Sequence, residues 1–177
     1  LFTDDMGVYR DHNGKPEYNW QYIDELFDFI RSIGMKPFVE LGFMPGGLAS
    51  GSKTIFWWKG NVTPPRDMQK WADFIRAFTL HVQERYGHDE VKTWYFEVWN
   101  EPNLGTFWAG SRAQYVDVLL VPAVEEIRKA DPDALVCGPE LAHLTSGGAD
   151  WYDWLLDVLR RAGSSIDVVT HHVYDRD

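Results

Sequence analysis

The chain has 177 residues, of which 45% are hydrophobic and 15% aromatic, so it is long and apolar enough to bury a core. Its 27 acidic and 17 basic side chains give a formal net charge of −10, which argues against nucleic acid as a partner because phosphate binding takes clustered Lys and Arg. The single cysteine, Cys137, excludes an intrachain disulfide and any site of several thiolates.

Two amphipathic helices are predicted in the first half of the chain from the spacing of apolar residues. The first is expected to follow Asn19 and to end at Gly34, which suits the left-handed position after a helix. The second is expected to open at Thr63-Pro64-Pro65, because proline is tolerated in a first turn, and to end at Gly87.

Two further helices are predicted in the second half. Ser111 and Gln114 have the spacing of a capping box, which starts a helix that continues to residue 130. Pro122 inside this segment predicts a kink or a break. The last helix is expected over about residues 150–162 and ends at Gly163.

Apolar runs of strand type alternate with these helices, at residues 36–41, 94–99, 134–137 and 166–170. Regular alternation of helix and strand predicts a parallel sheet with right-handed crossovers. No linker rich in Pro, Gly or Ser divides the chain, so we predict one domain over residues 1–177.

An open doubly wound sheet and a closed barrel both fit this alternation. The glycine cluster Pro45-Gly46-Gly47 does not match the phosphate-binding pattern of an open sheet. Glu40 and Glu97 lie inside apolar strands, and a closed barrel tolerates inward polar side chains near its mouth. We therefore favour an α/β fold of the (β/α) barrel type.

The densest chemistry lies in Trp99-Asn100-Glu101-Pro102-Asn103, at the expected carboxyl end of the second strand, where α/β folds place their sites. Glu97, Trp99 and Glu101 are expected to share one strand face. Flanking aromatic residues remove solvent from the Glu101 carboxyl, which favours its protonated form as a proton donor to a leaving oxygen. Spacing alone leaves open that Glu101 is a turn carboxylate and the aromatic residues are core.

The nine residues from Phe96 to Leu104 resemble the acid/base strand of the retaining glycoside hydrolases with a barrel fold. Residues 2–6, 18–45 and 56–65 extend the likeness over the whole chain. Together these stretches resemble glycoside hydrolase family 39, which includes the β-xylosidases. The resemblance implies a partial (β/α)8 barrel, about strands 2 to 6 with their helices, within one catalytic domain.

The resemblance also implies an activity on β-xylosides during hemicellulose degradation. Glu101 matches the general acid/base, and Asn100 matches the residue that binds the sugar 2-hydroxyl. His172 and Tyr174 match two residues that line the sugar subsite, and Phe107 matches an aromatic residue beside the scissile sugar. Further subsite candidates are aromatic: Trp57, Trp58 and Trp108.

A retaining glycosidase uses a second carboxylate, roughly 5 Å from the first, as nucleophile. In this family the nucleophilic Glu ends the seventh strand, and by this register residues 1–177 stop just past the sixth. The nucleophile is therefore expected outside this chain, which by itself is expected to be inactive. Glu140 ends the fifth strand and is not expected to be the nucleophile.

No His-Glu-x-x-His motif occurs, and His81 and His88 are expected on the surface. Strand parity directs His171 away from His172, so we predict no metal pair there. We predict a carbohydrate partner, such as a xylo-oligosaccharide or aryl xyloside, and no cofactor, metal or membrane. The longest uncharged stretch, Leu41–Ser52, is far shorter than the roughly 18 apolar residues of a membrane helix.

Two alternatives remain open: a carbohydrate-binding or structural fragment without catalysis, and a related β-glucosidase or α-L-iduronidase specificity. The compartment also stays open, with the low cysteine content slightly favouring the cytoplasm over secretion. The oligomeric state is not readable from these residues.

Overall fold

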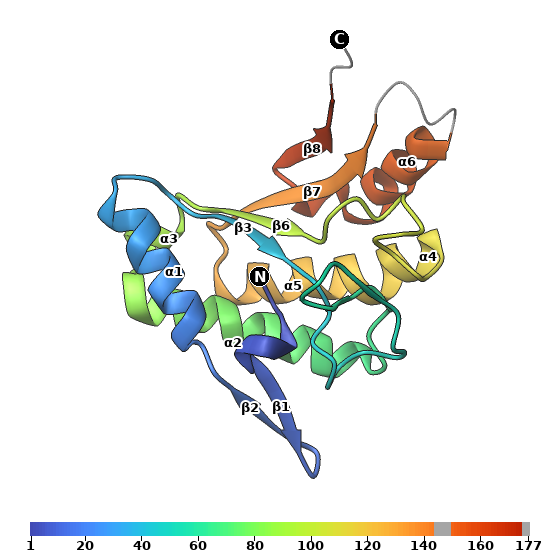
Figure 1. Ribbon diagram of the computed structural model, residues 1–177. Helices are drawn as coiled ribbons and strands as arrows, with labels where there is room; N and C mark the ends of the chain where they lie inside the picture. Colours follow the sequence, from blue (N-terminus) through green and yellow to red (C-terminus); the bar gives the residue numbers. More distant parts are fainter. Residues whose placement is uncertain (144–149, 175–177) are drawn as a thin grey trace.

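The computed structural model describes residues 1–143 and 150–174 (Figure 1). No helix in these ranges is both long and apolar enough to cross a membrane. Short 3-10 turns occupy Asp4–Met6 and Gly163–Ser165, and a π-helical turn occupies Tyr115–Leu120. The remaining elements in chain order are β1 (Tyr9–His12), β2 (Lys15–Tyr18), α1 (Gln21–Ser32), β3 (Phe38–Leu41), β4 (Thr54–Ile55), β5 (Gly60–Asn61), α2 (Met68–Tyr86), α3 (His88–Val91), β6 (Tyr95–Val98), α4 (Arg112–Gln114), α5 (Val121–Ala130), β7 (Leu135–Ala142), α6 (Asp150–Ala162) and β8 (Val168–His172).

The main sheet contains the four predicted strands, in the order β3-β6-β7-β8. All three pairings are parallel, which confirms the predicted parallel sheet. Each strand pairs with the next one in the chain, as in a (β/α) barrel, whereas a doubly wound sheet reverses its order at a switch point. The hairpins β1-β2 and β4-β5 are separate two-stranded antiparallel sheets.

Helices α1, α2 and α5 lie along one face of the sheet, as Figure 1 shows. Apolar residues fill the layer between these helices and the sheet and account for most of the core. They include Ile23, Phe27, Val39, Leu41, Phe74, Ile75, Phe78, Phe96, Val98 and Ile127. Phe38 and Tyr95 point to the other face, where they stack at 5.4 Å and remain 54% and 38% exposed. That face is the interior side of the barrel, and it also carries the strand carboxylates.

The start of α2 differs from its predicted position. The helix begins at Met68, and Asp67 caps it by accepting the amides of the second and third helical residues at 2.9 and 3.2 Å. The prediction that Thr63-Pro64-Pro65 opens the helix is therefore wrong. The Thr63 hydroxyl instead donates to the side chain of Asn61 at 2.7 Å, which holds this segment in a loop.

The predicted carboxyl ends of the helices and the capping box are confirmed, whereas Trp20 and not Asn19 is the residue at the cap position of α1. Gly34 and Gly87 follow α1 and α2 with φ of 78° and 84°, in the region that favours glycine. Ser111 and Gln114 form both hydrogen bonds of the capping box, at 2.9 and 3.1 Å. Pro122 lies in the first turn of α5, directly after the π-helical turn, and the backbone on both sides of it stays helical. The predicted break is therefore absent, and the irregularity near Pro122 is the π-helical turn before it.

Candidate functional site

Glu101 lies just beyond the carboxyl end of β6, which stops at Val98. The backbone leaves the extended conformation at Trp99, with φ of 77°, and Glu101 also has a positive φ of 46°. The expectation that both residues continue one face of a strand with Glu97 is therefore wrong. Left-handed backbone at a non-glycine residue costs on the order of 1–3 kcal/mol and is concentrated at functional sites.

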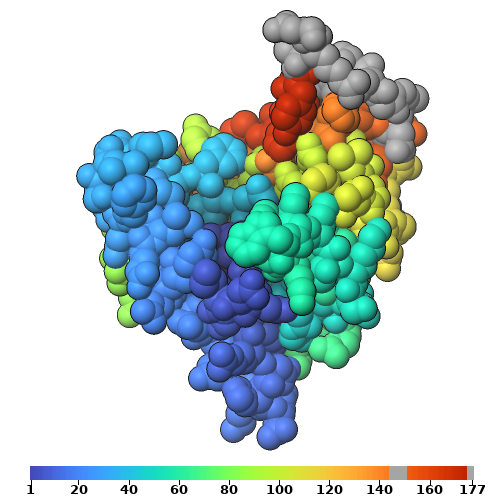
Figure 2. Space-filling model, viewed as in Figure 1, coloured from blue at the N-terminus to red at the C-terminus, as the bar shows by residue number. Residues whose placement is uncertain are grey.

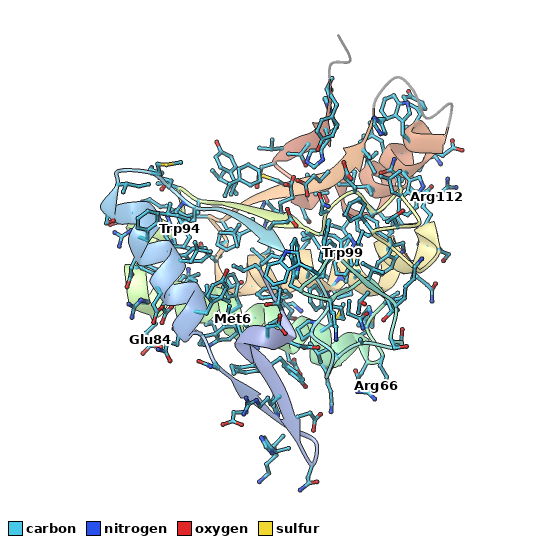
Figure 3. The ribbon with its side chains drawn as sticks, in the orientation of Figure 1. Met6, Arg66, Glu84, Trp94, Trp99 and Arg112 are labelled. Carbon is cyan, nitrogen blue, oxygen red and sulfur yellow. The ribbon has the colours of Figure 1, made fainter. Side chains whose placement is uncertain are left out.

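Trp99 anchors this turn from the core (Figure 3). Its indole N–H donates to the carbonyl of Phe107 at 2.9 Å, and its ring packs edge-on against Phe43 and Trp108 at 5.2 and 5.3 Å. Trp108 is only 2% exposed and donates its own N–H to the carbonyl of Ser111 at 2.9 Å. Trp108 thus supports Trp99 from inside the core and presents no open face to a ligand.

Two hydrogen-bonded contacts tie the turn after β6 to β7. The amide of Glu101 donates to the carbonyl of Glu140 at 3.1 Å. The side chain of Asn103 accepts from the amide and donates to the carbonyl of Ala142, both at 2.9 Å. Sequence reasoning missed this role of Asn103, although asparagine is a residue type that bonds loop backbone.

Glu140 enters the site through an irregularity in its strand. Its φ is 48°, and the pairing of β7 with β8 shifts register around it. Such a bulge redirects a side chain that regular alternation would place elsewhere. Glu140 is consequently buried, at 7% exposure, beside the equally buried Glu101.

His172 joins the two carboxyl groups. Its Nδ1 lies 2.8 Å from Oε1 of Glu101, and its Nε2 lies 2.9 Å from Oε1 of Glu140. Exposure along β8 alternates, so His172 faces the barrel interior while the exposed His171 faces the other side, as predicted. A neutral imidazole has one N–H and one acceptor nitrogen, so making both bonds requires a proton on a carboxyl or an imidazolium.

The carboxyl groups on the strands indicate whether the extra proton lies on a carboxyl group or on the imidazole. Glu40 and Glu97 are directly paired in the sheet, and burial raises the pKa of each. Burial, followed by the negative charges of Glu97 and Glu40, raises the pKa of Glu140 far above its usual range. The raised pKa favours the protonated form of Glu140, whose carboxyl contacts two acceptors, the Glu97 carboxyl and Nε2 of His172. Donation to Nε2 would leave the Nδ1–H of His172 to donate to Glu101.

Within the described part of the chain, two buried carboxyl oxygens near this site receive no hydrogen bond from an N–H or hydroxyl donor, although the two carboxyl groups that carry them are hydrogen-bonded to each other. These oxygens are Oε1 of Glu97 and Oε2 of Glu140. Buried polar atoms are normally satisfied, so an unpaired carboxyl oxygen is costly when ionised. This cost is a second reason for these groups to hold protons.

The other predicted site residues differ in how deeply their side chains are buried. Asn100 is half-buried between Trp99 and Glu101. The ring of Tyr174 lies 6.1 Å from that of His172 and is 66% exposed. Phe107 is partly buried, with its ring 6.2 Å from Phe43. The structure thus brings Glu101, His172 and Tyr174 together at one edge of the sheet.

A second aromatic surface lies in the long segment between β3 and α2. Trp57 is 85% exposed, and with Trp58 and Tyr22 it lines a pocket of about 340 Å³ against the N-terminal residues. Figure 2 shows these N-terminal residues, in blue, next to the segment in teal. Phe56 in the same segment packs against Phe107 at 5.7 Å, which connects the surface to the loop after β6.

Comparisons with known proteins cover the whole chain. The profile of the family described as glycosyl hydrolases family 39 matches residues 1–177. The β-xylosidase of Geobacillus stearothermophilus is 44% identical over 181 residues, covering 98% of this chain and 35% of that protein. The β-xylosidase of Caldicellulosiruptor saccharolyticus is 42% identical over 177 residues, covering 99% of this chain and 35% of that protein.

A solved structure agrees with the sequence comparisons. The crystal structure of a monomeric β-xylosidase from Caulobacter crescentus CB15 matches with a TM-score of 0.88 and 41% identity, covering 100% of this chain and 35% of that one. The chain therefore spans about a third of the length of the relatives that it matches.

Proposed function

The chain belongs to glycoside hydrolase family 39 and folds as an α/β fragment of that family's barrel, and we propose that it supplies the acid/base half of a retaining β-xylosidase site. The observation that carries the proposal is the position of Glu101. Its carboxyl lies at the carboxyl end of a barrel strand and contacts His172, whose other ring nitrogen contacts Glu140. Active sites of (β/α) barrels lie at this edge.

In the first step, Glu101 gives its proton to the glycosidic oxygen while the bond between that oxygen and the xylose anomeric carbon breaks. A nucleophilic carboxylate takes the sugar as a covalent glycosyl-enzyme. In the second step, the Glu101 carboxylate takes a proton from the water that attacks this intermediate. In both steps the carboxyl group of Glu101 changes its charge while it stays in the same position. The surrounding hydrogen bonds hold it there.

The nucleophile in this proposal is a carboxylate outside residues 1–177. Glu140 does not fit that role, although it lies close to Glu101, because burial raises its pKa, which favours the protonated form, and one of its oxygens contacts His172 at 2.9 Å. A protonated carboxyl group is a poor nucleophile. The share of the relatives' length that this chain covers, 35%, leaves room for the second carboxylate elsewhere in the barrel.

His172 positions the acid/base in this proposal. Its Nδ1–H donates to Glu101, and that bond strengthens when Glu101 becomes an anion. Protonated Glu140 holds the imidazole in the tautomer that this donation needs. Asn100 is proposed to bind the sugar 2-hydroxyl, and Tyr174 and Phe107 are proposed to line the subsite.

The test places residues 1–177 in a complete barrel, with the rest of the barrel taken from the Geobacillus stearothermophilus β-xylosidase. Glu101→Gln removes the proton donor while keeping the shape of the side chain. Hydrolysis of xylobiose, which has a poor leaving group, should fall by about 10²–10⁴-fold. Release of dinitrophenol from an activated aryl β-xyloside should fall far less, because that leaving group departs without a proton.

Glu84→Gln is the matched control, because Glu84 is an exposed carboxylate on the outer helix α2 (Figure 3). It should leave both activities unchanged. An equal loss on both substrates in Glu101→Gln would contradict the acid role. Parallel assays with aryl β-glucosides and α-L-iduronides decide the specificity, and a preference for either over the β-xyloside would refute the proposed substrate.

A further inference from the structure

Three side chains capable of binding a metal meet at the edge of the sheet opposite to Glu101. His88 begins α3, which leads into β6, and Asp131 and Asp133 lie between α5 and β7. Because β6 and β7 are paired and parallel, the segments entering both strands lie side by side. The group is therefore formed by two loops at the amino ends of neighbouring strands, and it is separate from the site proposed above.

The two distances from His88 to the carboxylates are close to those between neighbouring ligands of one tetrahedral ion. Nε2 of His88 lies 3.3 Å from Oδ1 of Asp131 and 3.2 Å from Oδ2 of Asp133. Zinc bonds of about 2.0–2.2 Å in tetrahedral geometry give neighbouring ligand atoms a separation of about 3.4 Å. The three donor atoms all lie within 4.8 Å of one another.

The surroundings of the Asp131 carboxylate favour a bound cation. It is completely buried, and its Oδ2 has no hydrogen-bond partner in the described ranges. Its Oδ1 accepts the amide of Asp133 at 3.0 Å, which fixes the carboxylate orientation. Asp131 also caps the carboxyl end of α5, where the helix dipole disfavours a negative charge. A buried carboxylate in this position is stabilised by nearby positive charge, which Lys92 supplies in part and a bound cation would supply directly.

We propose that His88, Asp131 and Asp133 bind a divalent transition-metal ion of the zinc type, with water completing the coordination. One imidazole and two carboxylates suit zinc, whereas calcium and magnesium prefer all-oxygen sites. The imidazole of His88 is 47% exposed, so an ion reaches the group from solvent. The ion ties the segment before β6 to the segment before β7, which is a structural role.

This proposal departs from the sequence-based expectation of no metal, whereas His88 lies on the surface as predicted. The residue types were visible, but 43 positions separate His88 from Asp131, so no local motif joins them. The proposal does not depend on the glycosidase function, because its residues lie at the other end of the strands.

The test uses the full chain of residues 1–177, stripped with a chelator and checked for folding by circular dichroism. Zinc titration by calorimetry should show one site, and cobalt(II) should give the visible absorption of a tetrahedral complex. Loss of an outer-shell partner typically weakens metal binding about 10–100-fold, so removing a direct ligand in His88→Ala or Asp133→Asn should weaken it at least tenfold.

Asp89→Asn is the matched control, since Asp89 is a neighbouring acid whose side chain is 92% exposed and bonded to Lys92 at 2.6 Å. It should bind zinc like the original chain. Absence of zinc binding to the folded chain would overturn the proposal. Equal affinity in His88→Ala and the original chain, or calcium binding as tight as zinc, would overturn it as well.

Discussion

His172→Phe tests the hydrogen-bonded chain that links Glu101 to Glu140. The substitution keeps a planar ring of similar size and removes both nitrogens, and with them the bonds of 2.8 and 2.9 Å. A hydrogen bond to a charged group contributes about 1.5–3 kcal/mol. Only the bond to Glu101 changes during the reaction, because Glu101 becomes an anion when it gives up its proton. One such bond corresponds to about a 10–150-fold loss in rate.

The assay measures kcat and KM on xylobiose in the complete barrel described above. We expect the loss in His172→Phe to fall mainly on kcat, because the bond stabilises the charge that develops in the transition state. Glu140→Gln is the matched comparison, since an amide N–H still donates to Nε2 of His172 and keeps its tautomer. It should retain kcat within a few-fold of the original.

Two results would refute the reasoning. If His172→Phe retained kcat within threefold, the imidazole would not support the charge on Glu101. If Glu140→Gln abolished activity while His172→Phe did not, Glu140 would act through its carboxylate and not through the imidazole. The second result would return Glu140 to consideration as a reacting group.

Three further predictions concern stability and binding of the full chain. Burial raises the pKa of Glu140, so the folded chain holds a proton that the unfolded chain releases above about pH 4.3. Stability should therefore fall as pH rises from there toward the folded pKa, by at most about 1.4 kcal/mol per pH unit for this proton, and Glu140→Gln should flatten the dependence in urea titrations. A dependence unchanged in this variant would argue against the raised pKa. Asp67→Ala removes two capping bonds from α2 and should lower the free energy of unfolding by about 0.5–2 kcal/mol, whereas an unchanged urea midpoint would contradict the cap. Finally, if the chain binds xylobiose without catalysis, calorimetry should detect heat at millimolar sugar that Trp57→Ala abolishes without unfolding, since Trp57 is 85% exposed. No heat in the original chain would eliminate this alternative.

Local patterns in the sequence were sufficient to predict the main helices and the parallel sheet. Apolar periodicity and end signals such as Gly34 and Gly87 predicted the helices, and alternation of helix and strand predicted the parallel sheet. These features depend on residues within a few positions of one another. The same locality explains the errors: proline tolerance suggested a helix start at 63–65, but the Asp67 cap starts the helix later.

The candidate site was predictable only in part. Glu101 stood out because its neighbours in the sequence are unusual, and strand parity correctly directed His172 inward. Whether an aromatic residue faces solvent or core is decided by packing, so Trp108 was expected to line the subsite although its side chain lies in the core. Asn103 was missed because its partner, Ala142, lies on another strand.

The sequence by itself determined the order of the main helices and of the four strands of the main sheet, the type of sheet and the family to which the chain belongs, because these depend on local spacing and on motifs of adjacent residues. It did not predict the hairpins β1-β2 and β4-β5. Only the tertiary structure decided which carboxyl groups lie together. Strand register and the bulge in β7 bring Glu140 against His172, 32 positions away, and burial raises the pKa of Glu140. The pairing of β6 with β7 brings His88 next to Asp131 at the opposite edge of the sheet. Charge and protonation depend on what surrounds a group in space, and that is decided only when distant segments pack together.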